Sequence, residues 1–339
     1  MPAGPADRAS LLRVLSGAWL AQCCYALAKL GIPDLLAGGP RPAADLARES
    51  RTDPRALHRM LRALAGAGIL AETPDGAFAL SPMAEPLKSG VPRSSRDAAV
   101  MFGEEVFRSF AEIVYTLQTG RPAFDKVYGM PFYDYLERNP RAADTFSVAM
   151  AGAAVPAALA TCDLDGVRVV ADIGGGEGGL LARVLRAHPH ARGILLDLPQ
   201  AVARARTRLS VAGVADRVEF VAGSFFERVP AGADAYVLCR VLHNWPDEDA
   251  LRLLREVRSV MPPGGRLFVF EELLGQQNRA GAASPMDLLL LVMLSGWDRT
   301  EAEYRELLGA AGFTVAAVRP PPLRARQAES VIEAAPATG

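Results

Sequence analysis

His243 is the residue whose type and surroundings point most directly to chemistry. It stands in the stretch LCRVLHNWP (238–246), after the strand-like run AYVL and before Pro246 and the acidic turn DED. A strand therefore passes into a helix at this point, and ligands of open α/β sheets bind where parallel strands end. A neutral imidazole at that edge can take a proton from a reacting group. His243 is therefore a candidate to act on a ligand bound at this edge.

A glycine-rich turn, DIGGGEGG (172–179), ends an earlier strand-like run and begins a helix. Glycines let a ligand approach the N–H groups at the start of that helix. Asp197 ends the next strand, where a carboxylate can accept both hydroxyls of a ribose. Asp172, ahead of the glycines, suits an ammonium group and disfavours a pyrophosphate. A ribose and an ammonium without phosphates describe S-adenosylmethionine, which we predict as the cofactor.

The elements that must position these residues alternate between strand and helix from residue 166 onward. The strand-length apolar runs are VRVVADIG, GILLDL, RVEFVAG, DAYVLC, RLFVFEE, FTVAAV and SVIEAA. Helix-period segments such as GLLARVLRAH and DALRLLREVRSVM separate most of them. This pattern is typical of an α/β fold in which helices cover both faces of a parallel sheet.

Residues 10–85 show a different pattern, with three helices and a hairpin in winged-helix order. Gly31 ends the first helix, and Asp53 with Pro54 begins the third. A winged helix raises the alternative of a DNA-binding regulator, which would need a basic surface. Basic and acidic residues are nearly balanced here, and the formal net charge of the chain is -1. The sequence therefore favours no nucleic-acid partner.

The sequence also indicates the cellular compartment of the protein and whether a metal ion is expected. The four cysteines show neither CxxC nor a zinc-ligand spacing, which indicates a reducing compartment. The start of the chain lacks the pattern of a signal peptide. The longest uncharged run, 14–28, is shorter than the ~20 residues that span a bilayer. We expect a cytoplasmic protein with no membrane partner, and no metal because no second histidine lies in 286–300.

Several longer motifs occur in the order and spacing of S-adenosylmethionine-dependent O-methyltransferases. They are DIGGGEGGLLARVL, LLDLPQ, GSFFERVP, RVLHNWPDEDALRLLREV, PGGRLFVFEELL and WDRTEAEYRELLGAAGF. Over almost its whole length the chain resembles the branch that contains plant caffeate-type enzymes and bacterial polyketide-tailoring enzymes. The resemblance implies a Rossmann-like class I methyltransferase sheet of seven strands, with the last pair as an antiparallel hairpin.

The resemblance also implies a homodimer and a division of the chain. We expect a winged-helix dimerisation domain at 1–90, a helical linker and substrate-pocket region at 91–160, and the S-adenosylmethionine-binding catalytic domain at 161–339. The middle segment is rich in aromatic residues. Some of them can wall a flat apolar substrate, and others pack between helices.

Site residues follow from the resemblance position by position. His243 matches the base of an LHDW or LHNW motif, and Glu271 and Asp298 match the two acids that flank it. The implied cofactor-binding residues are Asp172, Gly174, Gly175, Gly176, Asp197, Leu198, Gly223, Ser224, Phe225, Cys239 and Arg240. The implied acceptor-pocket residues are Phe146, Met150, Asn244, Met286, Asp287 and Trp297.

Four of these positions depart from the family pattern. Ser224 stands where many members have Asp, so the resemblance implies stacking from Phe225 but does not carry the adenine hydrogen bond over to Ser224. Cys239 and Trp297 stand where plant members carry lysine, and Asp298 where they carry Glu. The acceptor pocket is therefore expected to differ from that of the plant enzymes.

Together these features predict an O-methyltransferase that acts on a phenolic or other aromatic hydroxyl of a secondary metabolite, such as an antibiotic precursor. Methyl transfer is a direct displacement, and a phenol with pKa near ~10 needs a base at neutral pH. The alternatives within the same fold are a C-methyltransferase and a relative that binds the cofactor without methylating. A nicotinamide dehydrogenase is disfavoured, because nothing after Asp197 supplies hydride chemistry.

Overall fold

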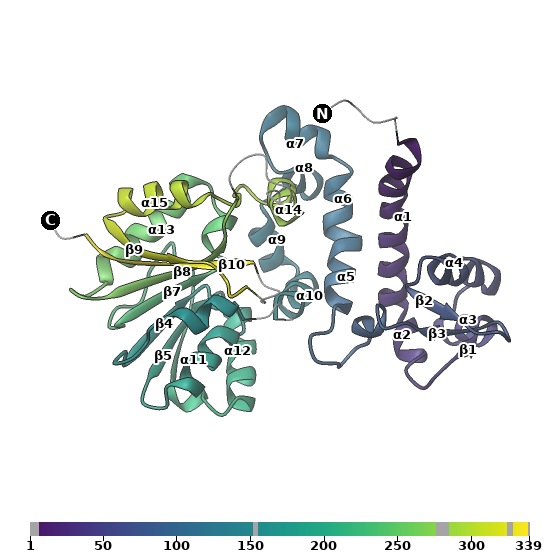
Figure 1. The fold of residues 1–339 in the computed structure, drawn as a ribbon, viewed down its shortest axis with the longest axis horizontal. Coiled ribbons are helices and arrows are strands. Elements are labelled where there is room, and N and C mark those ends of the chain that lie inside the picture. Colours follow the sequence, from purple (N-terminus) through teal and green to yellow (C-terminus); the bar gives the residue numbers. More distant parts are fainter. Residues whose placement is uncertain (1–6, 152–154, 276–284, 324–327, 338–339) are drawn as a thin grey trace. The chain divides into compact units, whose positions relative to one another are not determined.

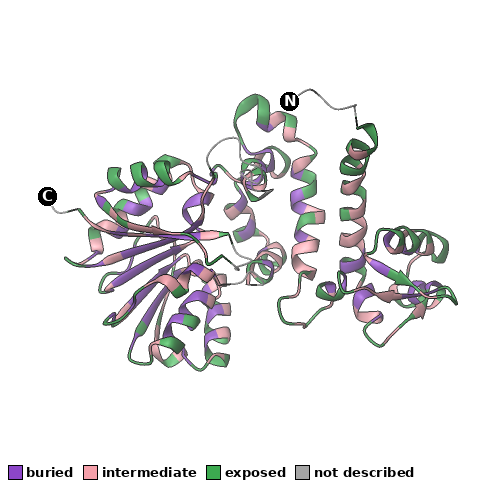
Figure 2. Ribbon diagram, viewed as in Figure 1, coloured by how far each residue is buried: buried purple, intermediate pink, exposed green. Residues whose placement is uncertain are grey.

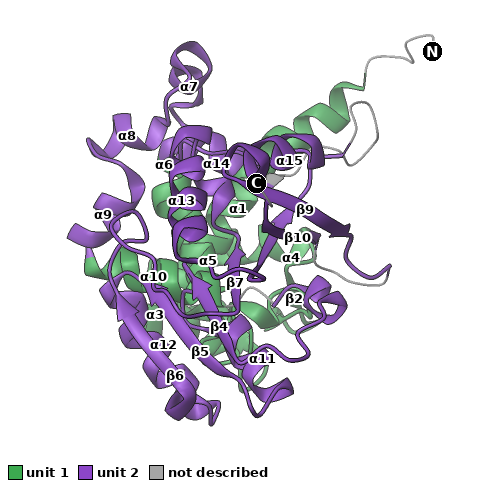
Figure 3. Ribbon diagram, turned by 90° about the vertical axis from the view of Figure 1, so that its left-hand side faces the viewer, with its two compact units in different colours: residues 1–108, 140–153 green, residues 109–139, 154–339 purple. Residues whose placement is uncertain are grey.

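The computed structural model describes residues 7–151, 155–275, 285–323 and 328–337 (Figure 1). The chain forms two compact units, and each is described by itself (Figure 3). The first unit contains residues 1–108 and 140–153, and the second contains 109–139 and 154–339. Both units are thus discontinuous in sequence.

Capping residues mark two of the helix ends in the first unit. The bounds are α1 (Arg8–Leu30), α2 (Ile32–Leu35), α3 (Ala43–Ser50), α4 (Pro54–Gly66), α5 (Arg96–Met101) and α10 (Pro140–Ala151). Gly31 ends α1 with a φ of 68°, in the left-handed region that glycine adopts at low cost. The Asp53 side chain accepts a hydrogen bond from the amide of Ala56 at 2.7 Å and so caps α4. Both predicted helix limits are confirmed.

A small antiparallel sheet completes the winged-helix pattern. Its strands are β1 (Arg41–Pro42), β2 (Leu70–Glu72) and β3 (Ala77–Leu80), in the order β1-β3-β2. Leu46, Leu61 and Phe78 are fully buried between this sheet and the helices. The three helices and the hairpin expected from residues 10–85 are therefore present.

The middle of the chain is helical, as its pattern predicts. After α5 a π-helical turn (Phe102–Val106) leads into α6 (Phe107–Phe110). The next helices are α7 (Ile113–Thr119), α8 (Ala123–Tyr128) and α9 (Phe132–Arg138). Phe124 packs against Tyr128, Phe132 and Tyr135, with ring centroids 4.4 to 5.4 Å apart. These aromatic side chains serve helix packing.

The second unit is built on a seven-stranded sheet in the order β6-β5-β4-β7-β8-β10-β9. The bounds are β4 (Val169–Ile173), β5 (Arg192–Asp197), β6 (Val218–Ala222), β7 (Ala235–Cys239), β8 (Arg266–Glu272), β9 (Phe313–Arg319) and β10 (Glu329–Pro336). Strand β10 pairs antiparallel with β8 and β9, and the remaining pairs are parallel. The predicted sheet and its terminal hairpin are confirmed.

Helices cover both faces of this sheet, so its central strands β4, β5, β7 and β8 are mostly buried (Figure 2). α11 (Gly179–Ala187) and α12 (Pro199–Val211) pack on one face, and α13 (Asp247–Val260) and α15 (Glu301–Ala310) on the other. α14 (Pro285–Met293) contacts α7 and α8. Short 3-10 turns lie at Glu85–Leu87, Ala157–Thr161, Ala215–Arg217 and Leu242–Asn244. The carboxyl ends of β4, β5, β7 and β8 consequently share one edge, where the candidate site lies.

Candidate active site

His243 is buried in the 3-10 turn that follows β7, with 8% of its surface exposed. Its Nδ1 lies 3.2 Å from Oδ1 of Asp298, with which it forms a hydrogen bond. Oε2 of Glu271 lies 3.3 Å from the same nitrogen. It interacts with the ring through its charge and forms no hydrogen bond with a described residue. Two carboxylates therefore meet one ring nitrogen. We assign the proton to Nδ1, which leaves Nε2 as the basic atom.

Glu271 has a second role in the same turn. Its Oε1 accepts from the backbone amides of Val241 (3.1 Å), Leu242 (2.9 Å) and His243 (3.4 Å). The residue lies near the end of β8, whose register pairs Cys239 with Phe270 and so brings the carboxylate beside the turn. One side chain thus holds both the backbone and the ring of the candidate base.

The charges of the acids decide the pKa of the imidazole. Burial by itself would lower the pKa of His243, but the negative charges of Glu271 and Asp298 outweigh it, and the pKa is raised above its ordinary value. For Glu271 burial acts in the opposite direction and raises the pKa of the carboxyl, while His243 and the turn amides oppose this rise. A buried imidazolium is therefore stabilised at this position.

Other predicted residues surround the acids. Asp287 on α14 accepts from the backbone amide of Asp298 at 3.0 Å. Asn244 donates its side-chain amide to the carbonyl of Arg240 at 3.2 Å. Met286, at the start of α14, and Trp297, beside Asp298, are both partly exposed. These residues lie in the same unit as His243.

Phe146 and Met150 are placed differently. Both lie on α10, which belongs to the first unit, where Phe146 is half-buried and Met150 exposed. Their role in the acceptor pocket remains a prediction from the sequence.

The glycine turn after β4 forms a backbone cradle. Gly174 and Gly176 have φ values of 71° and 55°, which glycine tolerates best. The amide of Gly176 donates to Oδ2 of Asp197 at 2.7 Å, and the amide of Leu198 donates to Oδ1 at 2.7 Å. Burial raises the pKa of Asp197, although these two amides oppose the rise. Asp197 is thus held at the end of β5, beside the turn.

Asp172 is a buried carboxyl group at the end of β4, and neither of its oxygens has a hydrogen-bond partner among the described residues. Burial and, to a smaller extent, the charge of Asp197 raise its pKa to about 7. The backbone amide of Leu181 opposes this rise, although it forms no hydrogen bond with the carboxyl. A Cβ on Gly175 would lie 2.7 Å from the Asp172 Cγ, so the turn packs tightly on the carboxyl. An unpartnered carboxyl at this place fits a ligand with a positive group, such as an ammonium.

The turn after β6 carries the residues predicted for adenine. The amide of Gly223 donates to the carbonyl of Asp197 at 3.0 Å. Ser224 accepts from the amide of Phe226 at 3.2 Å, so its hydroxyl is used within the turn. The ring of Phe225 packs edge-on against Phe226, with centroids 4.8 Å apart. Phe225 is half-buried, and its stacking on adenine stays a prediction from the sequence.

Cys239 and Arg240, at the end of β7, complete the predicted cofactor residues. Burial strongly raises the pKa of Cys239, so its thiol is neutral at this edge of the sheet. Arg240 adopts a left-handed φ of 56°, and its guanidinium forms an ion pair with Glu329 on β10. Cys239 is therefore uncharged, and the positive charge nearest to it in sequence, that of Arg240, is paired with Glu329.

Sequence reasoning missed three residues of this region. Tyr133 on α9 stacks on Trp245 with ring centroids 5.4 Å apart, and burial, followed by the charge of Asp197, raises its pKa. Arg299 donates to the turn that carries His243, and Gly296 lies against the same turn. The signal in the sequence is the isolated glycine of GWDR, because such a glycine often marks a close approach of another backbone segment.

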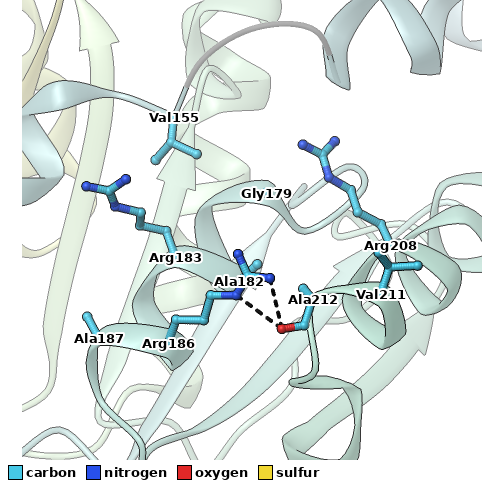
Figure 4. A pocket seen from close by; sticks show the side chains of 9 residues that line it. All are labelled: Val155, Gly179, Ala182, Arg183, Arg186, Ala187, Arg208, Val211 and Ala212. Carbon is cyan, nitrogen blue, oxygen red and sulfur yellow. Dashed lines mark hydrogen bonds between the residues drawn. The ribbon is translucent and has the colours of Figure 1, made fainter. Parts of the chain in front are cut away.

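A hollow of ≈ 620 Å³ lies beside α11 and α12, and Gly179, at the end of the glycine-rich turn, is among its lining residues (Figure 4). Arg183, Arg186 and Arg208 contribute to its lining. Arg186 donates to the carbonyl of Ala212, and Arg208 is paired with Glu177 at 3.2 Å. No predicted site residue lines this hollow, and we assign it no part in the reaction. Among the described residues, no group of three or more His, Cys, Asp and Glu is arranged to hold a metal ion.

Comparison with protein families gives two matches. A family described as the O-methyltransferase domain matches residues 107–314, and one described as the O-methyltransferase dimerisation domain matches residues 12–89. The phenazine O-methyltransferase PhzM of Lysobacter antibioticus is 39% identical over 329 residues, 96% of this chain and 95% of the relative. The 8-amino-8-demethylriboflavin N,N-dimethyltransferase of Streptomyces davaonensis is 41% identical over 304 residues, 87% of each chain.

Solved structures agree. The crystal structure of LaPhzM matches with a TM-score of 0.92 and 39% identity, covering 97% of this chain and 98% of the other. The O-methyltransferase NcsB1 from neocarzinostatin biosynthesis, solved with S-adenosylmethionine and 2-hydroxy-5-methyl naphthoic acid, matches with a TM-score of 0.80 and 31% identity. That match covers 93% of this chain and 95% of the other.

The fold and these similarities define a class I methyltransferase that uses S-adenosylmethionine. The chain belongs to the O-methyltransferase family whose bacterial members serve antibiotic biosynthesis, and it carries that family's dimerisation domain, which indicates a homodimer. The predictions of family, fold and cofactor are confirmed. Of the described helices, α1 is long and apolar enough to cross a membrane, but helices packed inside proteins pass the same test.

Proposed function

We propose that the protein transfers a methyl group to an aromatic hydroxyl of a secondary metabolite, with His243 as the general base. The observation that carries the proposal is the pair of buried carboxylates on Nδ1 of His243, with Asp298 at 3.2 Å and Glu271 at 3.3 Å. Such acids fix the tautomer that leaves Nε2 basic, and they stabilise the imidazolium once the proton has moved. The relative that methylates a phenazine oxygen supports a flat aromatic acceptor.

The chain's residues divide the work between binding and proton transfer. When bound, S-adenosylmethionine supplies a methyl group on a positively charged sulfur. Asp172 would hold its ammonium, Asp197 its ribose and Phe225 its adenine. Nε2 of His243 would accept the hydroxyl proton while the acceptor oxygen takes the methyl group and the methyl–sulfur bond breaks, which would leave the sulfur as a neutral thioether. Alignment contributes up to about 7–11 kcal/mol and a general base typically about 10²–10⁴ in rate.

A second candidate is methylation of an aromatic amine. The N,N-dimethyltransferase relative, at 41% identity, favours it. A neutral amine already presents a lone pair, so its proton can leave after the transfer and the base matters less. Acceptors matched in shape but bearing a hydroxyl, an amine or only ring carbon separate these functions, with products read by mass spectrometry. Methylation of carbon would return the C-methyltransferase alternative, and no product with any acceptor would favour a non-methylating relative.

The role of the base has its own test. His243→Ala should lower kcat by about 10²–10⁴ with little change in cofactor affinity, because the imidazole acts on the acceptor oxygen. The variant should regain rate as pH rises toward ~10, where a phenol ionises without help. The measurement is a pair of pH–rate profiles at saturating cofactor. His190→Ala, at an exposed histidine, is the matched control. Wild-type turnover of His243→Ala at neutral pH would refute the base.

A further inference from the structure

Arg299 is a buried arginine that the reaction as described does not use. It follows Asp298 directly, and only 1% of its surface is exposed. Its Nη1 donates to the carbonyl of Leu242 at 3.1 Å, and its Nη2 donates to the carbonyl of Trp245 at 2.8 Å. Nε and Nη2 also donate to Oδ1 of Asp247, at 2.9 and 2.7 Å. Burying such a cation is costly unless its donors are satisfied, and here each nitrogen has a partner.

The two carbonyls lie at the two sides of the candidate base. Leu242 immediately precedes His243, and Trp245 ends the 3-10 turn that carries it. Glu271 binds the amides of this turn with a negative charge, while Arg299 binds its carbonyls with a positive charge. The polar groups of the turn are therefore held by two buried side chains of opposite charge, and the peptide between them has little freedom to rotate.

Two aromatic rings and a backbone hydrogen bond hold Arg299 in place. Its guanidinium carbon lies 4.7 Å from the ring centre of Trp297 and 5.8 Å from that of Tyr304, within the range of cation–π attraction. Its own carbonyl accepts from the amide of Leu274, just after β8, at 3.0 Å. The planar fork of arginine matches several fixed acceptors at once, which a lysine ammonium does not.

We propose that Arg299 is a positioning residue for His243, through its hydrogen bonds to the carbonyls of Leu242 and Trp245. It keeps the ring within reach of Asp298 and Glu271 while Nε2 stays available to the acceptor. This role rests on the proposed function of His243 as the base. It adds a residue that tunes the base without touching the acceptor or the cofactor.

The test measures the histidine ring directly. Arg299→Met removes the donors and keeps much of the volume, and Arg299→Lys keeps the charge. Arg305→Met is the control, since Arg305 pairs with Glu301 on the surface of α15. The four histidines of isotopically labelled protein are titrated by NMR, and His243→Gln identifies the resonance of His243. Arg299→Met removes a cation, which by itself would raise the pKa of His243, but the ring also moves away from the two carboxylates that raise it. We expect the loss of the carboxylates to dominate, so the pKa of His243 should fall.

Kinetics supply the second readout. Arg299→Met should lower kcat by about 10–100-fold, as loss of an outer-shell partner commonly does, with cofactor affinity unchanged. Arg299→Lys should recover part of both the pKa and kcat, and Arg305→Met should alter neither.

The outcomes separate this inference from the proposed base. An unchanged His243 pKa in folded Arg299→Met overturns the role of Arg299, even if His243→Ala is inactive. A lowered pKa together with an active His243→Ala supports the role of Arg299 in placing the ring and refutes the base. If Arg299→Met does not fold, the same titration of Arg299→Lys tests the role instead, and a wild-type pKa and kcat there overturn the inference.

Discussion

At the scale of single residues, the acids behind His243 set the pH at which the imidazole is free to take a proton. Its pKa is raised by Glu271 and Asp298, and a base works only when neutral. Activity of the wild-type enzyme should therefore rise with pH through a pKa above the ordinary value of ~6.5 and then level off. Asp298→Asn removes one negative charge, so this rise should move to lower pH.

The plateau of the Asp298→Asn profile should also fall, by about tenfold or more, because the imidazolium loses a partner. The measurement is kcat against pH at saturating cofactor and acceptor. Glu248→Gln, at an exposed position in the first turn of α13, should leave the profile unchanged. A profile of Asp298→Asn that coincides with that of the wild type would show that the acid does not act on the base.

Asp172 gives a second prediction at this scale. The pKa of this carboxyl is raised to about 7 in the free protein, and a bound ammonium would favour its charged form. Cofactor binding near pH 6.5 should therefore release a proton. Titration calorimetry in two buffers of different ionisation enthalpy measures that release. Asp172→Asn should abolish it and weaken binding by about 10–100-fold, as expected for the loss of a charged hydrogen bond. Equal proton release by Asp172→Asn would place the titrating group elsewhere.

At the scale of elements, the segment before Asp298 must approach the turn of His243 closely. A Cβ on Gly296 would lie 2.2 Å from the carbonyl oxygen of His243 and 2.3 Å from the amide nitrogen of Trp245. Gly296→Ala should therefore push the two segments apart, lowering the free energy of unfolding by about 1–3 kcal/mol, and more if the backbone cannot yield. The activity should fall with it, because Asp298 lies on the same segment.

Gly309→Ala is the matched control for that substitution. Gly309 lies in α15, and a Cβ there would meet no atom within 4 Å. Replacing it should leave activity unchanged and stabilise the helix by up to about 1 kcal/mol. Chemical denaturation and kcat, measured for both variants, check the pair. Wild-type stability and turnover of Gly296→Ala would show that the segments can separate freely.

At the scale of the whole molecule, α1 presents apolar side chains that none of the described residues covers. Exposed members include Leu11, Leu12, Val14, Leu15 and Trp19, the last with 72% of its surface accessible. Residues 12–89 match the dimerisation domain of the family, so we expect this surface to meet a second copy of the chain.

Trp19→Glu should therefore shift the protein from dimer toward monomer at micromolar concentration, because a charge would be buried in an apolar interface. Light scattering measures the mass of the particle. Val211→Glu, at an even more exposed apolar residue of α12, should leave the dimer intact. If Trp19→Glu dimerises with the same affinity as the wild type, this part of α1 does not lie in the interface.

The sequence by itself determined the elements and their order. Continuous apolar runs of strand length, separated by helix-period segments, are consequences of local spacing and need no knowledge of distant residues. The placement of His243 at the end of β7 and of the glycine turn at the end of β4 follows from those runs. Glycine and acidic caps fixed helix ends such as Gly31 and Asp53 in the same way. The motifs then identified the family.

Only the tertiary structure decided how the site is held together. Glu271 and Asp298 meet the same nitrogen of His243 from positions 28 and 55 residues away along the chain. That meeting depends on the register of β8 against β7, and on the course of the chain after α14. The contacts of Arg299 could not be predicted from the GWDR segment, because its partners include the backbone carbonyls of Leu242 and Trp245, and every residue carries such a group. Gly296 matters only because another turn lies against it. Contacts between distant segments arise from packing, which the local periodicity of a sequence does not encode.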